Sequence, residues 1–306
     1  MVTGGGAPGN TDAQGTEEWN TGVPVGAFST APSMNTARGN IAGMGITTAA
    51  LAVGGRSPVV GINEQYNGSS WTEVGDLNTA RHSAAPSGTT TSALASGGET
   101  ATVFVAVVEE WNGSSWAETT DLNTTRGEGG GAGESAEAAL VFGGNPVTAV
   151  TESWNGSAWT EVNDLNTARI QLTSGLGRVY TAALASGGRA PPPSYLGITE
   201  LWNGTNWTEV NDMNTGRSSG AGQTGTSASA QVAGGYTGTA YSGVNENWNG
   251  TNWTEVADLS TGRSGAGGAG ADSTSALIYG GFTPSVTTAT EEWSNQSFST
   301  RTVSTD

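Results

Sequence analysis

Glutamate recurs at a fixed distance from an aromatic residue throughout the chain. In seven places a Glu lies two residues before an aromatic residue: Glu17, Glu64, Glu109, Glu152, Glu200, Glu246 and Glu291. Residues two apart in a strand share a face, so each carboxylate points the same way as a ring that belongs in the core. A buried carboxylate requires a partner, because an isolated charge is costly to remove from water.

Arginine recurs with a similar spacing and is the expected partner. It occupies one position in each repeat: Arg38, Arg81, Arg126, Arg169, Arg217 and Arg263. Its planar guanidinium suits bidentate contact with a carboxylate. We therefore expect an internal, structural Arg–Glu pair in each repeat, formed by Glu64, Arg81, Glu109, Arg126, Glu152, Arg169, Glu200, Arg217, Glu246 and Arg263. The alternative is a ring of carboxylates that lines a channel.

Groups for catalysis or metal binding are scarce in this chain. It contains one histidine, His82, and no cysteine. A serine–histidine–aspartate relay needs a positioned histidine, but His82 lies in a variable position beside Arg81, where we expect a surface or packing role. Without cysteine there is no thiol nucleophile and no thiolate zinc site. We expect no enzymatic activity and no cofactor, while calcium stays open because it needs only oxygen ligands.

Other motifs have a structural explanation. Gly265-x-Gly267-x-x-Gly270 matches the dinucleotide fingerprint but lacks the strand–helix context that the fingerprint requires. Aspartate recurs in a polar segment of the type Asp-Leu-Asn-Thr, where we interpret it as a turn former rather than a ligand. The aspartates concerned are Asp76, Asp121, Asp164, Asp212 and Asp258.

Two long loops differ from the rest of the repeat and form the candidate binding region. They span residues 189–197 (RAPPPSYLG) and 236–243 (YTGTAYSG). Variable loops on a rigid scaffold commonly carry recognition, and tyrosine gives a large contact area at low entropic cost. The candidate ligand-binding residues are Arg56, Arg189, Tyr195, Tyr236 and Tyr241. The alternative is that these loops are tolerated surface variation.

All these residues belong to a repeat that runs from one end of the chain to the other. The repeated arginines are separated by 43, 45, 43, 48 and 46 residues, and a glycine pair recurs at 54–55, 97–98, 143–144, 187–188, 234–235 and 280–281. Two aromatic columns contain all eleven tryptophans. We therefore expect the tryptophans to form the core, one pair per repeat, rather than a platform for stacking carbohydrate.

Each repeat divides into four short strands. A glycine-rich stretch follows the arginine, an apolar run ends in the glycine pair, a third strand ends in Glu-x-aromatic, and a fourth begins at the second aromatic residue. Asn-Gly between the third and fourth strands predicts a tight hairpin turn. Four antiparallel strands in about 45 residues are typical of a β-propeller blade. The glycine-rich strand fits the innermost position, where strands crowd a common axis.

The order of glycine pair, Glu-x-aromatic, second tryptophan, polar turn and arginine resembles the kelch repeat over essentially the whole chain. The repeated sequence NGSSWTEV…DLNTAR also resembles kelch-like proteins encoded by tailed phages of marine bacteria. The resemblance implies an all-β, kelch-like β-propeller that binds partners at the face carrying the two long loops. Copper chemistry of the kind known on kelch propellers requires cysteine, tyrosine and histidine ligands, and a chain with no cysteine and one histidine excludes it.

We predict a single β-propeller domain over residues 1–306, with seven four-stranded antiparallel blades and with six as the alternative. The repeats are 1–38 (partial), 39–81, 82–126, 127–169, 170–217, 218–263 and 264–306. The first copy lacks its innermost strand and has four extra residues between Trp19 and Phe28. The tail 299–306 either forms a fourth strand or helps to close the ring onto the first blade.

The charge balance restricts the partners. The net charge is −17, with ten arginines and no lysine, and so acidic a surface repels nucleic acid and anionic lipid. We expect neither nucleic-acid binding nor membrane insertion, since no run reaches the roughly 20 apolar residues of a spanning helix. The N-terminus lacks the basic and apolar regions of a secretory signal, so none is expected.

Two functional hypotheses follow. The first is a non-enzymatic propeller at a phage virion surface or tail, with other virion proteins and a host-surface glycan or protein as partners. It implies a virion or extracellular location. The second is a cellular lectin-like or protein-interaction scaffold, which implies a cytoplasmic location.

Overall fold

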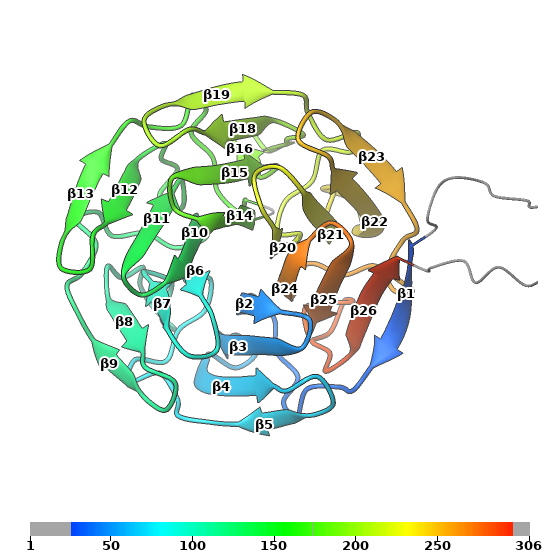
Figure 1. The fold of residues 1–306 in the computed structure, drawn as a ribbon, viewed down its shortest axis with the longest axis horizontal. Coiled ribbons are helices and arrows are strands. Elements are labelled where there is room, and N and C mark those ends of the chain that lie inside the picture. Colours follow the sequence, from blue (N-terminus) through cyan, green and yellow to red (C-terminus); the bar gives the residue numbers. More distant parts are fainter. Residues whose placement is uncertain (1–25, 173, 296–306) are drawn as a thin grey trace, which may run out of the picture.

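A computed structural model of the chain describes residues 26–172 and 174–295, which form β-strands and no helix. Most strands belong to four-stranded antiparallel units that follow the order of the chain. In Figure 1 these units are arranged one after another around a common centre, and each unit has one strand next to that centre. The coarse prediction of an all-β fold built from four-stranded antiparallel sheets is therefore confirmed.

The first three units contain four consecutive strands each. The first unit comprises β2 (Ala42–Ile46), β3 (Ala49–Gly55), β4 (Val60–Tyr66) and β5 (Trp71–Glu73). The second comprises β6 (Ala85–Gly88), β7 (Ala93–Ser96), β8 (Val108–Trp111) and β9 (Trp116–Glu118). The third comprises β10 (Gly130–Ser135), β11 (Ala138–Phe142), β12 (Thr151–Trp154) and β13 (Trp159–Val162).

The remaining units carry the irregular elements. The fourth comprises β14 (Ser174–Val179), β15 (Ala182–Ser186), β18 (Thr199–Trp202) and β19 (Trp207–Val210), with a small hairpin, β16 (Arg189–Ala190) and β17 (Ser194–Tyr195), inserted before β18. The fifth comprises β20 (Ala221–Gly225), β21 (Ala230–Tyr236), β22 (Tyr241–Trp248) and β23 (Trp253–Val256). The sixth comprises β24 (Gly267–Asp272), β25 (Ser275–Tyr279), β26 (Thr290–Asn295) and the N-terminal β1 (Gly26–Ala31).

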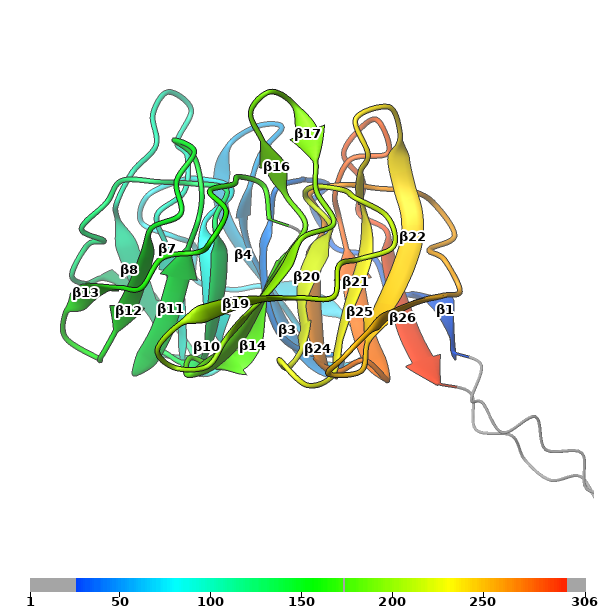
Figure 2. The ribbon, with the colours of Figure 1, turned by 90° about the horizontal axis from the view of Figure 1, so that it is seen from above.

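The two ends of the units differ in their connections. Figure 2 shows the long connections between second and third strands, including β16–β17, at one end of the units. We call this end the loop face, and the opposite end, with the turns between third and fourth strands, the turn face. On the turn face Asn67 Oδ1 accepts hydrogen bonds from the N–H groups of Ser69 and Ser70, both at 2.9 Å, and Gly68 has a φ of 91°. The predicted Asn-Gly hairpins therefore form.

Glycines on the central strands allow neighbouring units to approach closely. A Cβ on Gly43 of β2 would overlap the backbone nitrogen of Gly268 in β24, and one on Gly131 of β10 would overlap the carbonyl oxygen of Pro86 in β6. The glycine-rich strand of the repeat is thus the innermost one, as predicted, because the backbones leave no room for a side chain there.

Aromatic pairs with at least one tryptophan fill the outer part of each unit. Ten of the eleven tryptophans are buried, and Trp19 lies outside the described residues. Trp111 and Trp116 are typical, with ring centroids 5.4 Å apart. The prediction that the tryptophans form the core is confirmed for these ten, and it follows from the large area that each indole removes from water.

The N-terminal strand completes the sixth unit. β1 pairs antiparallel with β26, from Gly26 opposite Asn295 to Ala31 opposite Thr290. Phe28 packs on Trp293 with ring centroids 5.2 Å apart. Within the described residues the strands form four four-stranded sheets, the β16–β17 hairpin and one eight-stranded sheet, in which a parallel bridge between β20 and β24 joins the fifth and sixth units. The seventh predicted blade has no separate sheet among these residues. Glu17, Trp19 and the tail 299–306, on which that prediction depended, lie outside the described residues.

A cycle of backbone hydrogen bonds links the six units near their centre. One residue from each unit donates its N–H to the carbonyl oxygen of its counterpart in the preceding unit, at 2.7–3.0 Å, and the first donates to the last. All six have positive φ, between 51° and 60°. We call them the inner ring: Asn40, Ser83, Glu128, Gln171, Ser219 and Gly265. The left-handed conformation directs each N–H toward the neighbouring unit.

Candidate functional site

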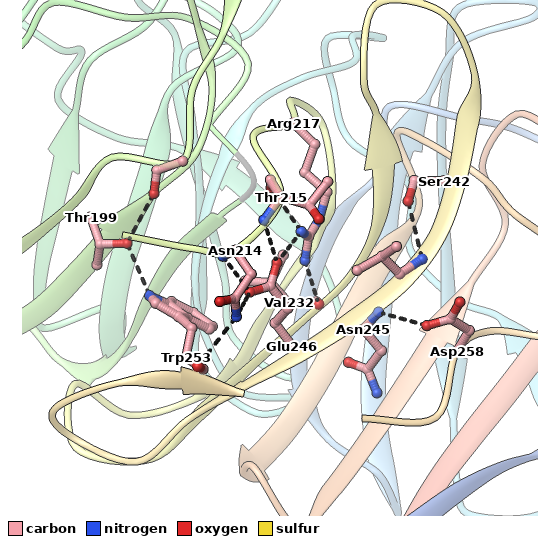
Figure 3. Close-up of polar contacts among 12 residues, drawn as sticks. Thr199, Asn214, Thr215, Arg217, Val232, Ser242, Asn245, Glu246, Trp253 and Asp258 are labelled. Carbon is pink, nitrogen blue, oxygen red and sulfur yellow. Dashed lines mark hydrogen bonds and ion pairs between the residues drawn. The ribbon is translucent and has the colours of Figure 1, made fainter. Parts of the chain in front are cut away.

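The repeated arginine and glutamate form a buried polar network, drawn for one unit in Figure 3. Arg217 Nη1 donates to Glu246 Oε1 and to the carbonyl oxygen of Thr215, and Nη2 donates to the carbonyl oxygen of Val232 at 3.1 Å. Asn214 donates to Glu246 Oε2 from its backbone nitrogen at 2.7 Å and from Nδ2 at 2.8 Å. Both carboxylate oxygens accept hydrogen bonds, so the buried charge is satisfied.

The predicted Arg–Glu pairing is confirmed, but the partner is different. Each arginine pairs with the glutamate of the following repeat, not with that of its own: Arg38–Glu64, Arg81–Glu109, Arg126–Glu152, Arg169–Glu200, Arg217–Glu246 and Arg263–Glu291. The reason is that the arginine leads into the first strand of the next unit and packs against that unit's second and third strands. The six glutamates are at most 5% exposed, which excludes the alternative of a carboxylate-lined channel for these residues.

Burial and hydrogen bonding act in opposite directions on these groups. Burial by itself raises the pKa of Glu109, but hydrogen bonds from Arg81, Asn78 and Thr79 outweigh it and hold the pKa below its usual value. Burial lowers the pKa of Arg126 and Arg263, against the opposing effect of their glutamates. Glu109 is therefore held as an anion by the groups that surround it.

The repeated aspartates are structural too. Asp258 Oδ1 accepts a hydrogen bond from the N–H of Asn245 at 3.3 Å (Figure 3), and Asp76, Asp121, Asp164 and Asp212 make the equivalent contact. These bonds join the polar segment to the third strand, 13 residues earlier in the chain, so the aspartates are structural but do not form the predicted local turn.

His82 lies between possible relay partners but lacks the properties of a base. Its Nδ1 is 3.0 Å from Ser83 Oγ and its Nε2 is 3.5 Å from Glu99 Oε2. Burial, with a smaller effect of Arg56, lowers the pKa of His82 to about 4, so the ring is a weak proton acceptor. The N–H of Ser83 is already bonded to the carbonyl oxygen of Asn40, so it does not serve an oxyanion. His82 has the predicted packing role.

The residue after each glycine pair forms a second ring on the loop face. In each unit it makes an isolated antiparallel bridge with the residue after the repeated arginine. We call these residues the outer ring: Arg56, Glu99, Asn145, Arg189, Tyr236 and Phe282. Three of them, Arg56, Arg189 and Tyr236, belong to the predicted site. The shared position of all six was not identified from the sequence, although a variable residue directly after an unchanging glycine pair is a usable signal.

Four of the five predicted binding residues come together on neighbouring units. Tyr195 of β17 and Tyr236 of β21 have ring centroids 5.7 Å apart, and Tyr236 and Tyr241 have centroids 5.5 Å apart. Arg189 lies directly opposite Tyr195 in the β16–β17 hairpin. We call these four residues the tyrosine–arginine cluster. Arg56 is not part of it, because it follows β3, which lies across the centre from β16 in Figure 1.

A hollow on the turn face offers less chemistry. It has a volume of about 230 Å³ and is lined by Gly45, Ile46, Ala49 and three threonines, Thr89, Thr90 and Thr91. Its lining contains no ionisable side chain, so it provides neither an acid, a base nor a charged anchor for a ligand. The loop face is the stronger candidate.

The part of the chain that the structure describes contains no group of three or more His, Asp or Glu side chains arranged to hold a metal ion. It also contains no helix long and apolar enough to cross a membrane.

Comparison with known proteins does not assign the chain to a family. No protein-family model matches it, and no curated protein sequence matches it.

Proposed function

We propose that the chain is a closed, six-bladed, kelch-like β-propeller. Three observations support closure: β1 pairs with β26, the inner ring returns from Gly265 to Asn40, and Tyr279 Oη of the sixth unit donates to the carbonyl oxygen of Leu51 in the first at 2.7 Å. A propeller leaves no long sheet edge exposed, which suits a chain without disulfides. The kelch assignment rests on the repeat pattern alone.

We further propose that this propeller is a non-enzymatic binding protein that contacts a host-surface glycan or protein through its loop face. The tyrosine–arginine cluster carries the proposal. It joins three aromatic rings and one cation from two neighbouring units on the face with the longest and least regular loops. Rigid tyrosine platforms give contact area at low entropic cost. Because the repeated sequence resembles kelch-like phage proteins, we propose that the protein lies at a phage virion surface or tail, in contact with other virion proteins.

The test is binding of the purified protein to a glycan array and to whole marine bacterial cells, with and without calcium. Changing Tyr195 and Tyr241 to Ala is expected to lower the affinity at least about tenfold, because aromatic anchors typically contribute most of the binding energy at an interface. Tyr180→Ala is the matched control, since Tyr180 is 39% exposed and Tyr241 38%, but Tyr180 lies in the β14–β15 turn on the turn face. Equal losses in both variants would contradict the site.

The second candidate function is a cellular lectin-like or protein-interaction scaffold in the cytoplasm. It uses the same face and is favoured by the same residues, so binding alone does not separate the two. Co-purification with virus particles does, because a cellular scaffold has no reason to accompany virions. Loss of the protein from washed particles would favour the cellular role.

A further inference from the structure

Two arginines of the described residues have no carboxylate partner. Six of the eight arginines whose side chains the structure describes are ion-paired with glutamate, and the exceptions are Arg56 and Arg189. The side chain of Arg189 makes no hydrogen bond with any residue that the structure describes. It is half-buried, so its guanidinium has given up part of its hydration without gaining an acceptor. In so acidic a chain, this leaves a cation available to an anion from outside.

The backbone holds Arg189 firmly in place. Its N–H donates to the carbonyl oxygen of Ile170 at 2.8 Å and its carbonyl oxygen accepts from the N–H of Ile170 at 3.0 Å. On its other side, the β16–β17 pairing sets it opposite Tyr195. Because directly opposite residues of an antiparallel pair lie close on one face of the sheet, the side chain of Arg189 is a neighbour of that of Tyr195. Figure 2 shows this hairpin projecting from the loop face.

The tyrosines beside it are also fixed before any ligand arrives. Gly238 packs directly against the ring of Tyr195, where a Cβ would overlap the ring. Tyr236 Oη donates to the carbonyl oxygen of Gly238 at 3.1 Å, which fixes the loop of the fifth unit, and the packing of Gly238 on Tyr195 joins this loop to the hairpin of the fourth. The hydroxyl groups of Tyr195 and Tyr241 make no hydrogen bond with the described residues. The cluster therefore combines apolar ring faces, two available hydroxyl groups and one available guanidinium.

Resting on the proposed binding function, we infer that the tyrosine–arginine cluster binds a glycan through a sugar that bears a single carboxylate. A sugar ring presents C–H groups to an aromatic face and hydroxyl groups to tyrosine, and a carboxylate accepts two parallel hydrogen bonds from a guanidinium. A quaternary ammonium ligand, which also binds aromatic clusters, is repelled by Arg189. The net charge of −17 repels a polyanion. A single carboxylate close to Arg189 is instead attracted mainly by the guanidinium, because salt screens the more distant charges of the protein.

The test uses pairs of glycans that differ only in the carboxylate. Oligosaccharides ending in a hexuronic acid or in a sialic acid are compared with their own methyl esters, and with a polysulfated glycan, by direct titration. The acid form is expected to bind at least about tenfold more tightly than its ester, because hydrogen bonds to a charged group are worth more than those to a neutral one. The uronic and sialic arms identify which acidic sugar fits.

Substitutions locate the effect. Arg189→Gln is expected to lose the preference for the acid while leaving affinity for the ester within about twofold, and Arg189→Lys to keep only part of it, because an ammonium does not bind bidentately. Arg56→Gln is the matched control, since Arg56 occupies the same position in another unit without neighbouring tyrosines. It is expected to retain the preference. Thermal unfolding of each variant verifies that the fold is kept.

Several outcomes would overturn the inference. Equal binding of acid and ester, tighter binding of the polysulfated glycan, or equal losses in Arg56→Gln and Arg189→Gln would each do so. If a neutral glycan or a protein binds with the expected dependence on Tyr195 and Tyr241, the proposed function stands and only the acidic sugar is excluded. If no ligand depends on those tyrosines, the proposed function fails as well.

Discussion

Arg81 illustrates why the repeated cation is arginine and not lysine. Its side chain donates to Glu109, to the carbonyl oxygen of Thr79 at 2.9 Å, to that of Gly97 at 2.9 Å and to that of Ala95 at 3.0 Å. These acceptors lie in different directions around a planar fork, and a lysine ammonium has too few donors and the wrong shape to reach them. A buried ion pair contributes little unless its hydrogen bonds are complete, and here they nearly are.

Glu109→Gln tests the pair at the residue scale. It leaves Arg81 buried without a counter-charge, and we expect the free energy of unfolding to fall by roughly 3–5 kcal/mol at neutral pH. The folded pKa of Glu109 lies below its ordinary value of 4.5, so the pair stabilises the fold above that value. This contribution is lost as the pH falls through the folded pKa. Urea titrations of both proteins from pH 7 to pH 3 should therefore show the difference shrinking in acid.

Glu118→Gln is the matched control for this prediction. Glu118 lies directly opposite Glu109 in the β8–β9 ladder but is exposed. We expect a change within about 0.5 kcal/mol, as for most surface substitutions. A loss at Glu118 as large as that at Glu109 would show that β8–β9 is sensitive to any substitution and would remove the support for the ion pair.

At the scale of the elements, neighbouring units are joined by the second tryptophan. Trp253 Nε1 of the fifth unit donates to Thr199 Oγ1 of the fourth at 3.0 Å (Figure 3), and Trp207 makes the same contact with Thr151 at 3.1 Å. The equivalent acceptor in the fifth unit is Asn245, and the equivalent ring in the sixth unit is Phe28, which has no N–H to donate. Asn245 Oδ1 has no hydrogen-bond partner among the described residues, and neither have Asn63 Oδ1 and Trp116 Nε1, which occupy the corresponding positions of the first and second units.

Phe28→Trp is expected to supply the missing donor. A net gain of about 1 kcal/mol in the free energy of unfolding follows from satisfying a buried oxygen, provided that the indole adopts the orientation of Trp253. Chemical denaturation of the variant measures this gain. In an Asn245→Val background, which removes the acceptor, the same substitution should give no gain. A double-mutant cycle then isolates the free energy of the hydrogen bond between the two side chains. An equal gain in both backgrounds would assign it to ring size instead.

At the scale of the whole molecule, the first described strand joins the last one. Six residues of β1 pair with six of β26, and Phe28 covers Trp293. Without β1 the outer edge of β26 would be open, and open edges are sites of non-native pairing. The proposed closure of the ring therefore depends on a contact between residues that are more than 250 positions apart.

Two truncations measure that contact. Removal of residues 1–31 deletes β1, whereas removal of 1–25 retains it, so their difference isolates the strand. We expect the longer truncation to lose at least about 3 kcal/mol relative to the shorter one, because it removes a partly buried phenylalanine together with a ladder of hydrogen bonds. Thermal unfolding and the red shift of tryptophan emission report the change. Equal stability of the two truncations would refute closure through β1.

Local patterns were sufficient for much of the fold. The strand order within a unit, the Asn-Gly turns, the innermost glycine-rich strand and the tryptophan core each depend on contacts within about 45 residues, and each occurs several times in the chain. Repetition made such patterns recognisable, because an accidental match does not recur at a constant spacing along the chain. For the candidate site, loop length and composition were enough to single out Tyr195, Tyr236, Tyr241 and Arg189.

Contacts between repeats were decided by the tertiary structure alone. The addition of β1 to β26, the inner ring and the separation of Arg56 from the tyrosine–arginine cluster depend on which units lie side by side. The pairing of each arginine depends on the connection that carries it into the following unit. The same repeat pattern results whether an arginine pairs with the glutamate of its own copy or with that of the next copy. The pattern therefore cannot distinguish the two pairings. The amino-acid sequence by itself determined the unit and its core, since these follow from short-range periodicity and turn chemistry. The tertiary structure determined the partners between units, because they follow from how the units pack around their common centre.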